Sequence, residues 1–178
     1  LLAMNVSKDI LDAFDTVNTG VQTTNITLSN QISQKYAAFE EQYGLDQEKV
    51  GPYWEKAQAL REEATDFINY VEALKWDLVK QVELAKATSD EEAIQMAINE
   101  RGLLKNSNTT LNGRTIYDIN TSKVKSRDGY NQPTEIMMGN PEGPGNGGKA
   151  YDLSEKMKRF RHKISRSEER RVGKECRS

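Results

Sequence analysis

The chain of 178 residues is poor in the side chains on which much enzyme chemistry depends. It contains one Cys, Cys176, and one His, His162. A single Cys excludes an internal disulfide and any zinc site built on a Cys pair. A single His likewise excludes every metal motif that needs two imidazoles. Few enzyme classes that depend on His or Cys are therefore left. Our prediction from the sequence as a whole is that the protein is not an enzyme and carries neither a metal nor another cofactor.

An excess of one charge and long hydrophobic runs are also missing. The sequence has 25 basic and 27 acidic residues, a net charge of -2. Nucleic-acid binding usually shows as a basic excess or patch, so we expect no nucleic-acid partner. Residues 1–4 are apolar, far short of the roughly 20 residues that cross a bilayer. Because a polar helix follows, we interpret them as the end of a truncated membrane helix, with a frayed helix start as the alternative.

The last thirteen residues, 166–178, contain almost no apolar side chains. They resemble, position by position, the translation of a sequencing-library adapter, and we interpret them as a tail of non-biological origin. A solvated charged tail is the alternative interpretation. Without this segment the sequence has no Cys and carries 20 basic against 24 acidic residues, a net charge of -4.

Residues 6–43 have the spacing of one long helix with an apolar stripe. Apolar side chains recur every three or four residues, with one step of seven, which is close to coiled-coil spacing. Residues 16–34 contain no charged side chain and are rich in poor or middling helix formers. We expect an unbroken helix through Gly20 that packs against another helix. The stripe consists of Val6, Ile10, Phe14, Val17, Val21, Leu28, Ile32, Tyr36, Phe39 and Tyr43.

A second long helix is predicted to start at Gly51-Pro52, because proline is favoured at the first helical position. Gly44 would end the first helix, and a connection of about seven residues would return the second helix antiparallel along the first. Trp54 and Trp76 lie beside its apolar stripe and are predicted to be packing residues. Helix-packing or dimer contacts are predicted for Val6, Ile10, Phe14, Val17, Val21, Leu28 and Ile32 of the first helix, and for Leu60, Phe67, Val71, Leu74 and Leu78 of the second.

The remaining sequence predicts shorter elements. Ser89 and Glu92 have the spacing of a capping box for a third helix, with Gly102 as its stop. Residues 105–149 are punctuated by turn residues and are predicted to be irregular but laid against the helices. A last helix is expected from about Ala150. The predicted fold class is all-α, a long-helix antiparallel bundle with a long irregular insertion before the last helix.

Two features resemble chemical motifs. Residues 143–150, Gly-Pro-Gly-Asn-Gly-Gly-Lys-Ala, nearly match a phosphate-binding loop. However, Ala150 replaces the hydroxyl that would bind Mg²⁺, and no buried strand precedes the loop. We interpret the segment as a glycine-rich connection into a helix. His162 lies between Arg161 and Lys163 without a local Ser, Cys or carboxylate partner, and we expect it to face solvent.

The opening sequence, Leu1-Leu-Ala-Met-Asn-Val-Ser-Lys-Asp-Ile-Leu-Asp-Ala-Phe14, is similar to the segment after the membrane helix in the family of the gliding motility protein GldM and its secretion homologue PorM. The similarity continues at residues 32–43 and 53–82 and recurs at 128–139 and 149–153. The resemblance implies a homodimer anchored in the inner membrane by one N-terminal helix. It places the helical domain first in a periplasmic part that continues into β domains.

The same resemblance implies partners and a function. The membrane helices would sit with a GldL- or PorL-type inner-membrane partner in a proton-driven motor, and β domains absent from this sequence would reach outer-membrane-associated ring proteins. Residues 5–165 would be the incomplete first periplasmic domain, which transmits motion to the type IX secretion and gliding apparatus. The resemblance assigns the motor's proton chemistry to no residue of this sequence. A periplasmic four-helix sensor domain, as in chemoreceptors, is the alternative function.

Overall fold

The computed structural model describes residues 8–106, 109–111, 113–126, 129, 131–139 and 147–175. The chain forms two units, residues 1–59 and residues 60–178. The border between them falls within the second long helix, which contributes to both.

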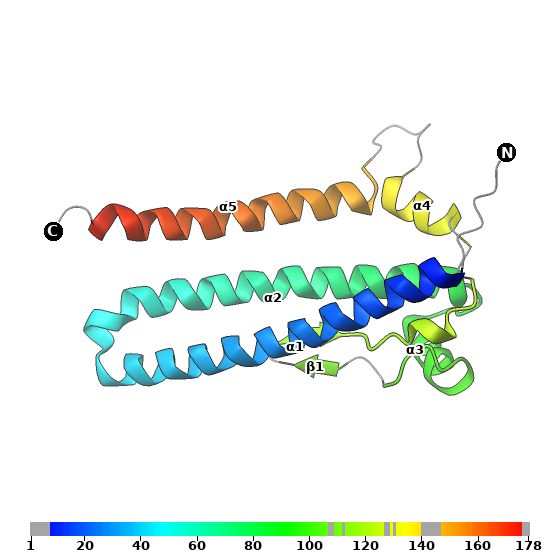
Figure 1. Ribbon diagram of the computed structural model, residues 1–178, viewed down its shortest axis with the longest axis horizontal. Coiled ribbons are helices and arrows are strands. Elements are labelled where there is room, and N and C mark those ends of the chain that lie inside the picture. Colours follow the sequence, from blue (N-terminus) through cyan, green and yellow to red (C-terminus); the bar gives the residue numbers. More distant parts are fainter. Residues whose placement is uncertain are drawn as a thin grey trace. The chain divides into compact units, whose positions relative to one another are not determined.

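The first unit contains helix α1 (Lys8–Leu45) and the beginning of helix α2 (Gln47–Glu83). Helix α1 is unbroken through Gly20, as predicted (Figure 1). The predicted start of α2 at Gly51 is wrong by four residues, and a single residue, Asp46, separates the helices instead of about seven. The physical reason is the Asp46 carboxylate, which accepts a hydrogen bond from the Lys49 backbone N–H at 2.9 Å and so caps the helix earlier.

Trp54 anchors this helical hairpin. Its ring stacks on Tyr43, with 5.7 Å between centroids, and meets the ring edges of Phe39 and Tyr36 at 5.3 and 6.4 Å. The Tyr36 hydroxyl donates a hydrogen bond to the Ala57 carbonyl at 2.8 Å. Residues later in α1 therefore meet residues earlier in α2. These contacts confirm the antiparallel return of α2 within this unit and the packing role of Trp54.

The core of the second unit gathers where α2 ends. Helix α3 (Asp90–Gln95) begins at Ser89, whose side chain accepts a hydrogen bond from the Glu92 backbone N–H. A π-helical turn, η1 (Met96–Glu100), continues it and ends before Gly102, which has a left-handed φ of 60°. The cap and the stop are both as predicted. The buried core comprises Trp76, Leu84, Ala93, Ala97, Leu103 and Leu104.

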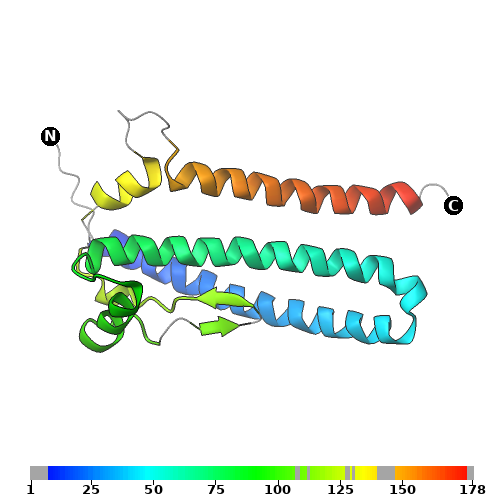
Figure 2. The ribbon, with the colours of Figure 1, turned by 180° about the vertical axis from the view of Figure 1, so that it is seen from behind.

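The segment predicted to be irregular contains several regular elements. Strands β1 (Thr109–Leu111) and β2 (Arg114–Ile116) pair antiparallel with Thr110 opposite Thr115 (Figure 2). A 3₁₀ turn, η2 (Thr121–Lys123), and helix α4 (Asn131–Met138) follow. The expectation of an irregular stretch was therefore wrong for these residues. The expectation that the segment lies against the helices is confirmed by Tyr117, which stacks on Trp76 with 5.3 Å between ring centroids.

Helix α5 (Lys149–Glu175) lies along the part of α2 that belongs to the second unit (Figure 1). Phe160 stacks on Phe67 at 5.7 Å between centroids, and the Lys163 ammonium pairs with the Glu63 carboxylate at 2.5 Å. Because later residues of α5 meet earlier residues of α2, the two helices are antiparallel. The fold is all-α, with long antiparallel helices in each unit and one small β-hairpin.

Candidate interaction surfaces

The predicted contact residues fall into two groups according to their helix. In α1, the six described members of the set are all exposed, with relative residue exposures between 45% and 68%. In α2, Leu74 is buried, and Leu60, Phe67, Val71 and Leu78 are partly buried. Val6 lies outside the described residues. The α1 group, which we call the α1 stripe, consists of Ile10, Phe14, Val17, Val21, Leu28 and Ile32.

The threonines of α1 satisfy their own hydroxyl groups. Five of them, Thr16, Thr19, Thr23, Thr24 and Thr27, each donate a hydrogen bond of 2.9 to 3.1 Å to the backbone carbonyl four residues earlier. Burying such a hydroxyl against another helix leaves no donor without a partner, so the usual desolvation cost is avoided. The uncharged middle of α1 is therefore suited to helix packing despite its polar composition.

One face of α2 holds the chain segment at 113–126 by its backbone. The Asn69 side chain donates to the Gly113 carbonyl at 3.1 Å and accepts from the Thr115 N–H at 2.5 Å. One turn further along, the Glu72 carboxylate accepts from the Tyr117 N–H at 3.2 Å. Since residues three and four apart share a helix face, these side chains and Trp76 form one row. We call residues 113–126 the strap.

Glu83 lies at the end of this row on α2 and forms a buried ion pair. Its carboxylate, 1% exposed, binds the guanidinium of Arg101 and accepts the N–H groups of Lys125 and Ser126 at 2.9 and 2.7 Å. Burial alone would raise the pKa of Glu83. The two backbone N–H groups and the charge of Arg101 outweigh burial and hold this pKa below its ordinary value. Glu83 is therefore ionised at neutral pH and ties the strap to the end of α2.

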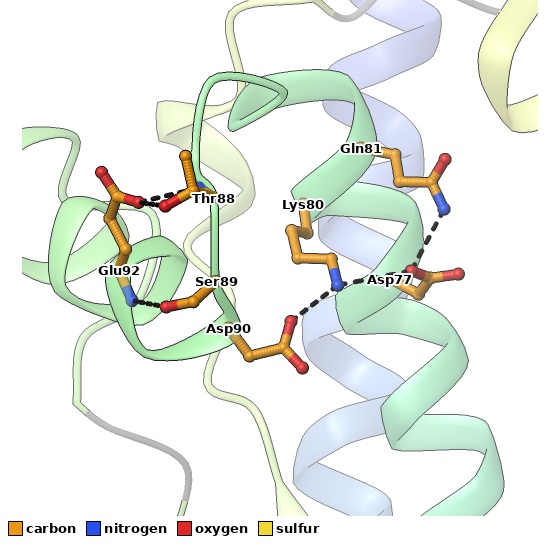
Figure 3. Close-up of polar contacts among 7 residues, drawn as sticks. All are labelled: Asp77, Lys80, Gln81, Thr88, Ser89, Asp90 and Glu92. Carbon is orange, nitrogen blue, oxygen red and sulfur yellow. Dashed lines mark hydrogen bonds and ion pairs between the residues drawn. The ribbon is translucent and has the colours of Figure 1, made fainter.

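A small cleft opens between the end of α2 and the start of α3. It has a volume of about 340 Å³ and is bordered by Lys80, Leu84, Thr88, Asp90 and Gln132, the last from α4. Figure 3 shows that the polar side chains here face one another. The Lys80 ammonium donates to Asp90 at 2.7 Å, and this bond raises the pKa of Lys80.

The polar groups of Thr88, at the border of the same cleft, are also hydrogen-bonded within the protein. The Glu92 carboxylate accepts hydrogen bonds from the Thr88 hydroxyl at 2.6 Å and from the Thr88 N–H at 2.7 Å (Figure 3). Both bonds lower the pKa of Glu92, and the hydroxyl bond has the larger effect. The lining therefore offers no nucleophile beside a free base. Its contacts serve to fix α3 against α2.

The remaining features considered in the sequence are a metal site, a membrane span, His162, the glycine-rich loop and Cys176. No group of His, Cys, Asp and Glu suited to a metal ion occurs among the described residues. None of the helices in the described ranges is long and apolar enough to span a membrane. His162 is exposed on α5, as expected. Half of the glycine-rich loop, residues 143–146, and Cys176 lie outside the described residues.

A comparison with known protein families shows which family the chain belongs to. The family model described as the GldM N-terminal domain matches residues 9–171, most of the 178 residues. The chain belongs to the GldM family. Members of this family are components of gliding motility and type IX secretion, and the match supports this interpretation over the sensor domain. Curated proteins and solved structures gave no match. The interpretation of residues 166–178 as a tail stays a prediction, and the family match extends into that segment.

Proposed function

We propose that this GldM-family chain is the periplasmic helical domain of a motor subunit that transmits proton-driven motion from the inner membrane to the type IX secretion and gliding apparatus. The observation that carries the proposal is the family match over residues 9–171. In this proposal the subunit is anchored by an N-terminal membrane helix and meets a GldL- or PorL-type partner there. It reaches outer-membrane-associated ring proteins through other domains, and it catalyses nothing.

The long helices support a mechanical role. Helices α1 and α2 have 38 and 37 residues, about 57 and 56 Å at 1.5 Å per residue. An unbroken helix of this length resists bending because each backbone hydrogen bond must deform together with its neighbours. A displacement applied at one end of such a helix is therefore delivered at the other.

The α1 stripe supports a homodimer. Its apolar side chains repeat at near-heptad spacing and stay exposed, although such a stripe normally faces a partner helix. At 100° per residue, Thr24 lies next to the stripe, and its hydroxyl is already bonded to the Gly20 carbonyl, so burying it leaves no donor unpaired. We propose that the α1 stripes of two subunits pack together.

The dimer is tested by replacing Val17, Val21 and Leu28 with Asp. Because these side chains are exposed within one chain, the triple variant should keep its helicity and lose half of its mass in light scattering. The same three changes in the parent protein should abolish secretion and gliding in cells.

A matched control places three Asp residues on α1 away from the stripe, at Gln22, Asn30 and Gln34, all exposed. The control should remain a dimer and support secretion. A stripe variant with wild-type mass would refute the dimer contact. A monomeric variant that still supports secretion and gliding would refute the role of this dimer in transmission.

A further inference from the structure

The α1 stripe has one place that no apolar side chain fills. The step from Val21 to Leu28 is seven residues long, and Thr24 and Asn25 lie within it. Val21 and Ile32 are eleven residues apart, which is three turns of a nearly straight helix, so the stripe stays on one face across this step. At 100° per residue, Thr24 and Asn25 lie at the two edges of that face. A helix packed on the stripe therefore covers both side chains.

The two polar side chains in this step differ in their hydrogen bonds. The Thr24 hydroxyl donates to the Gly20 carbonyl at 2.9 Å and needs no other acceptor. The Asn25 side chain is exposed and forms no hydrogen bond with any residue that the structure describes. Its amide has two N–H donors and an acceptor oxygen. Because burying them unpaired costs free energy, whatever covers the stripe must supply a hydrogen-bond partner at Asn25.

Helix α2 limits the length of α1 that is open to a partner. Tyr36, Phe39 and Tyr43 continue the apolar repeat, but within the first unit all three pack on Trp54. The stripe residues before them are exposed. We call residues 10–32 the open stretch, and a second copy of α1 has to match it.

We propose that Asn25 sets the orientation and register of the α1 contact, in which two α1 helices run parallel and their Asn25 side chains hydrogen-bond to each other. This inference rests on the dimer proposed above. In a parallel pair in register, each stripe residue meets its own copy, so each Asn25 amide can donate to the oxygen of the other. A single polar residue within an apolar helix contact fixes the register in this way, at a cost in stability.

An antiparallel pair that overlaps along the whole open stretch leaves the amides unpaired. Its two-fold axis passes at Val21, the middle of residues 10–32. Each Asn25 then lies against Val17 of the other copy, which has no side-chain hydrogen-bond donor or acceptor. Two such amides disfavour this pair by at least about thirtyfold.

A second antiparallel pair would satisfy the amides but shorten the contact. With its axis between Thr24 and Asn25, the amide would meet the threonine hydroxyl of the other copy. Ile10 would then lie opposite Phe39, which is covered by Trp54 of its own chain. The parallel pair therefore uses the whole open stretch and also pairs both amides.

The test is disulfide crosslinking of the full chain in a C176S background, which removes the one native cysteine. In the parallel pair, residue 10 meets residue 10, so I10C alone should form a disulfide-linked dimer in a glutathione buffer. In the antiparallel pair with full overlap, Ile10 meets Ile32. A mixture of I10C and I32C chains would then form mixed disulfides, whereas chains that keep Asn25 should form same-site disulfides at least about thirtyfold more often.

Replacing Asn25 with Val removes the amide from both orientations. N25V should lower the ratio of same-site to mixed disulfides about thirtyfold or more, while light scattering should still show a dimer. The matched control, N30V, makes the same change at an exposed residue on the opposite side of α1 and should keep the original ratio. Circular dichroism should show that both variants are folded.

The outcomes separate this inference from the dimer itself. Mixed disulfides as abundant as same-site ones in chains that keep Asn25 would overturn the role of Asn25 and leave the dimer standing. So would a ratio that N25V does not change, or that N30V lowers equally. A chain that is monomeric in light scattering would overturn the dimer and this inference together.

Discussion

Replacing Glu83 with Gln tests whether the buried ion pair holds the strap on α2. One carboxylate oxygen accepts both strap N–H groups and the other accepts the guanidinium of Arg101. A Gln side chain has one oxygen, so its amide N–H₂ must oppose either the two backbone donors or Arg101. Each orientation sets donor against donor and leaves the charge of Arg101 unpaired.

The magnitude follows from the burial of the two partners. Removing one member of a buried ion pair typically costs 3–5 kcal/mol, and because the Arg101 side chain keeps 24% of its exposure, we expect the lower end, about 3 kcal/mol. The assay is urea unfolding followed by the fluorescence of Trp76, in a W54F background that removes the other of the two Trp residues. The matched control is D90N, which breaks an exposed ion pair and should cost less than about 1 kcal/mol.

The pH dependence gives a second, independent reading. Because the pKa of Glu83 is lowered by folding, its stabilisation is complete above the unfolded pKa of about 4.3. It is lost as the pH falls through the lower, folded value. The stability difference between wild type and E83Q should therefore be constant near neutral pH and shrink below about pH 4.3. A cost below about 1 kcal/mol, or a difference that does not shrink on acidification, would refute the reasoning.

Three further substitutions probe single features of the second unit. The Tyr70 hydroxyl is buried without a hydrogen-bond partner among the described residues, so Y70F should leave the free energy of unfolding unchanged or raise it by up to about 1 kcal/mol in urea titration. S89A removes the cap of α3 and should cost about 1 kcal/mol in the same titration, whereas no loss would show that the cap is dispensable. Gly102 has φ of 60°, and a Cβ there would meet the Lys123 side chain at an ordinary contact distance of 4.0 Å, so G102A should cost about 1–2 kcal/mol of backbone strain and lower the melting temperature.

The long helices could be predicted because their signals are local. An apolar repeat of three and four residues is complete within each helix, and the Ser89 cap lies next to the helix that it starts. The start of α2 was missed because the prediction rested on Pro52 alone and did not use Asp46, whose carboxylate caps the helix. The hairpin was also within reach, since residues 109–116 read Thr-Thr-Leu-Asn-Gly-Arg-Thr-Ile, and Asn-Gly between two such runs is a strong hairpin signal.

The contacts of the strap could not be predicted in this way. Asn69 and Glu83 bind backbone groups more than 40 residues away, and backbone N–H groups leave no trace in the sequence. On α2 these side chains look like ordinary surface polar residues. The partner of the α1 stripe could not be predicted for a different reason. An apolar repeat indicates that a helix face is covered, but it does not indicate which element or molecule covers it.

The back-bonded threonines of α1 have a consequence for friction. Each hydroxyl of Thr16, Thr19, Thr23, Thr24 and Thr27 is held by its own helix, so none of the five offers its hydroxyl proton to a neighbouring helix. A helix that slides along these threonines has no hydroxyl hydrogen bond to break. The side-chain amide of Asn25, which fills the seven-residue step of the stripe, keeps its N–H groups for a partner and is the group that would fix the register.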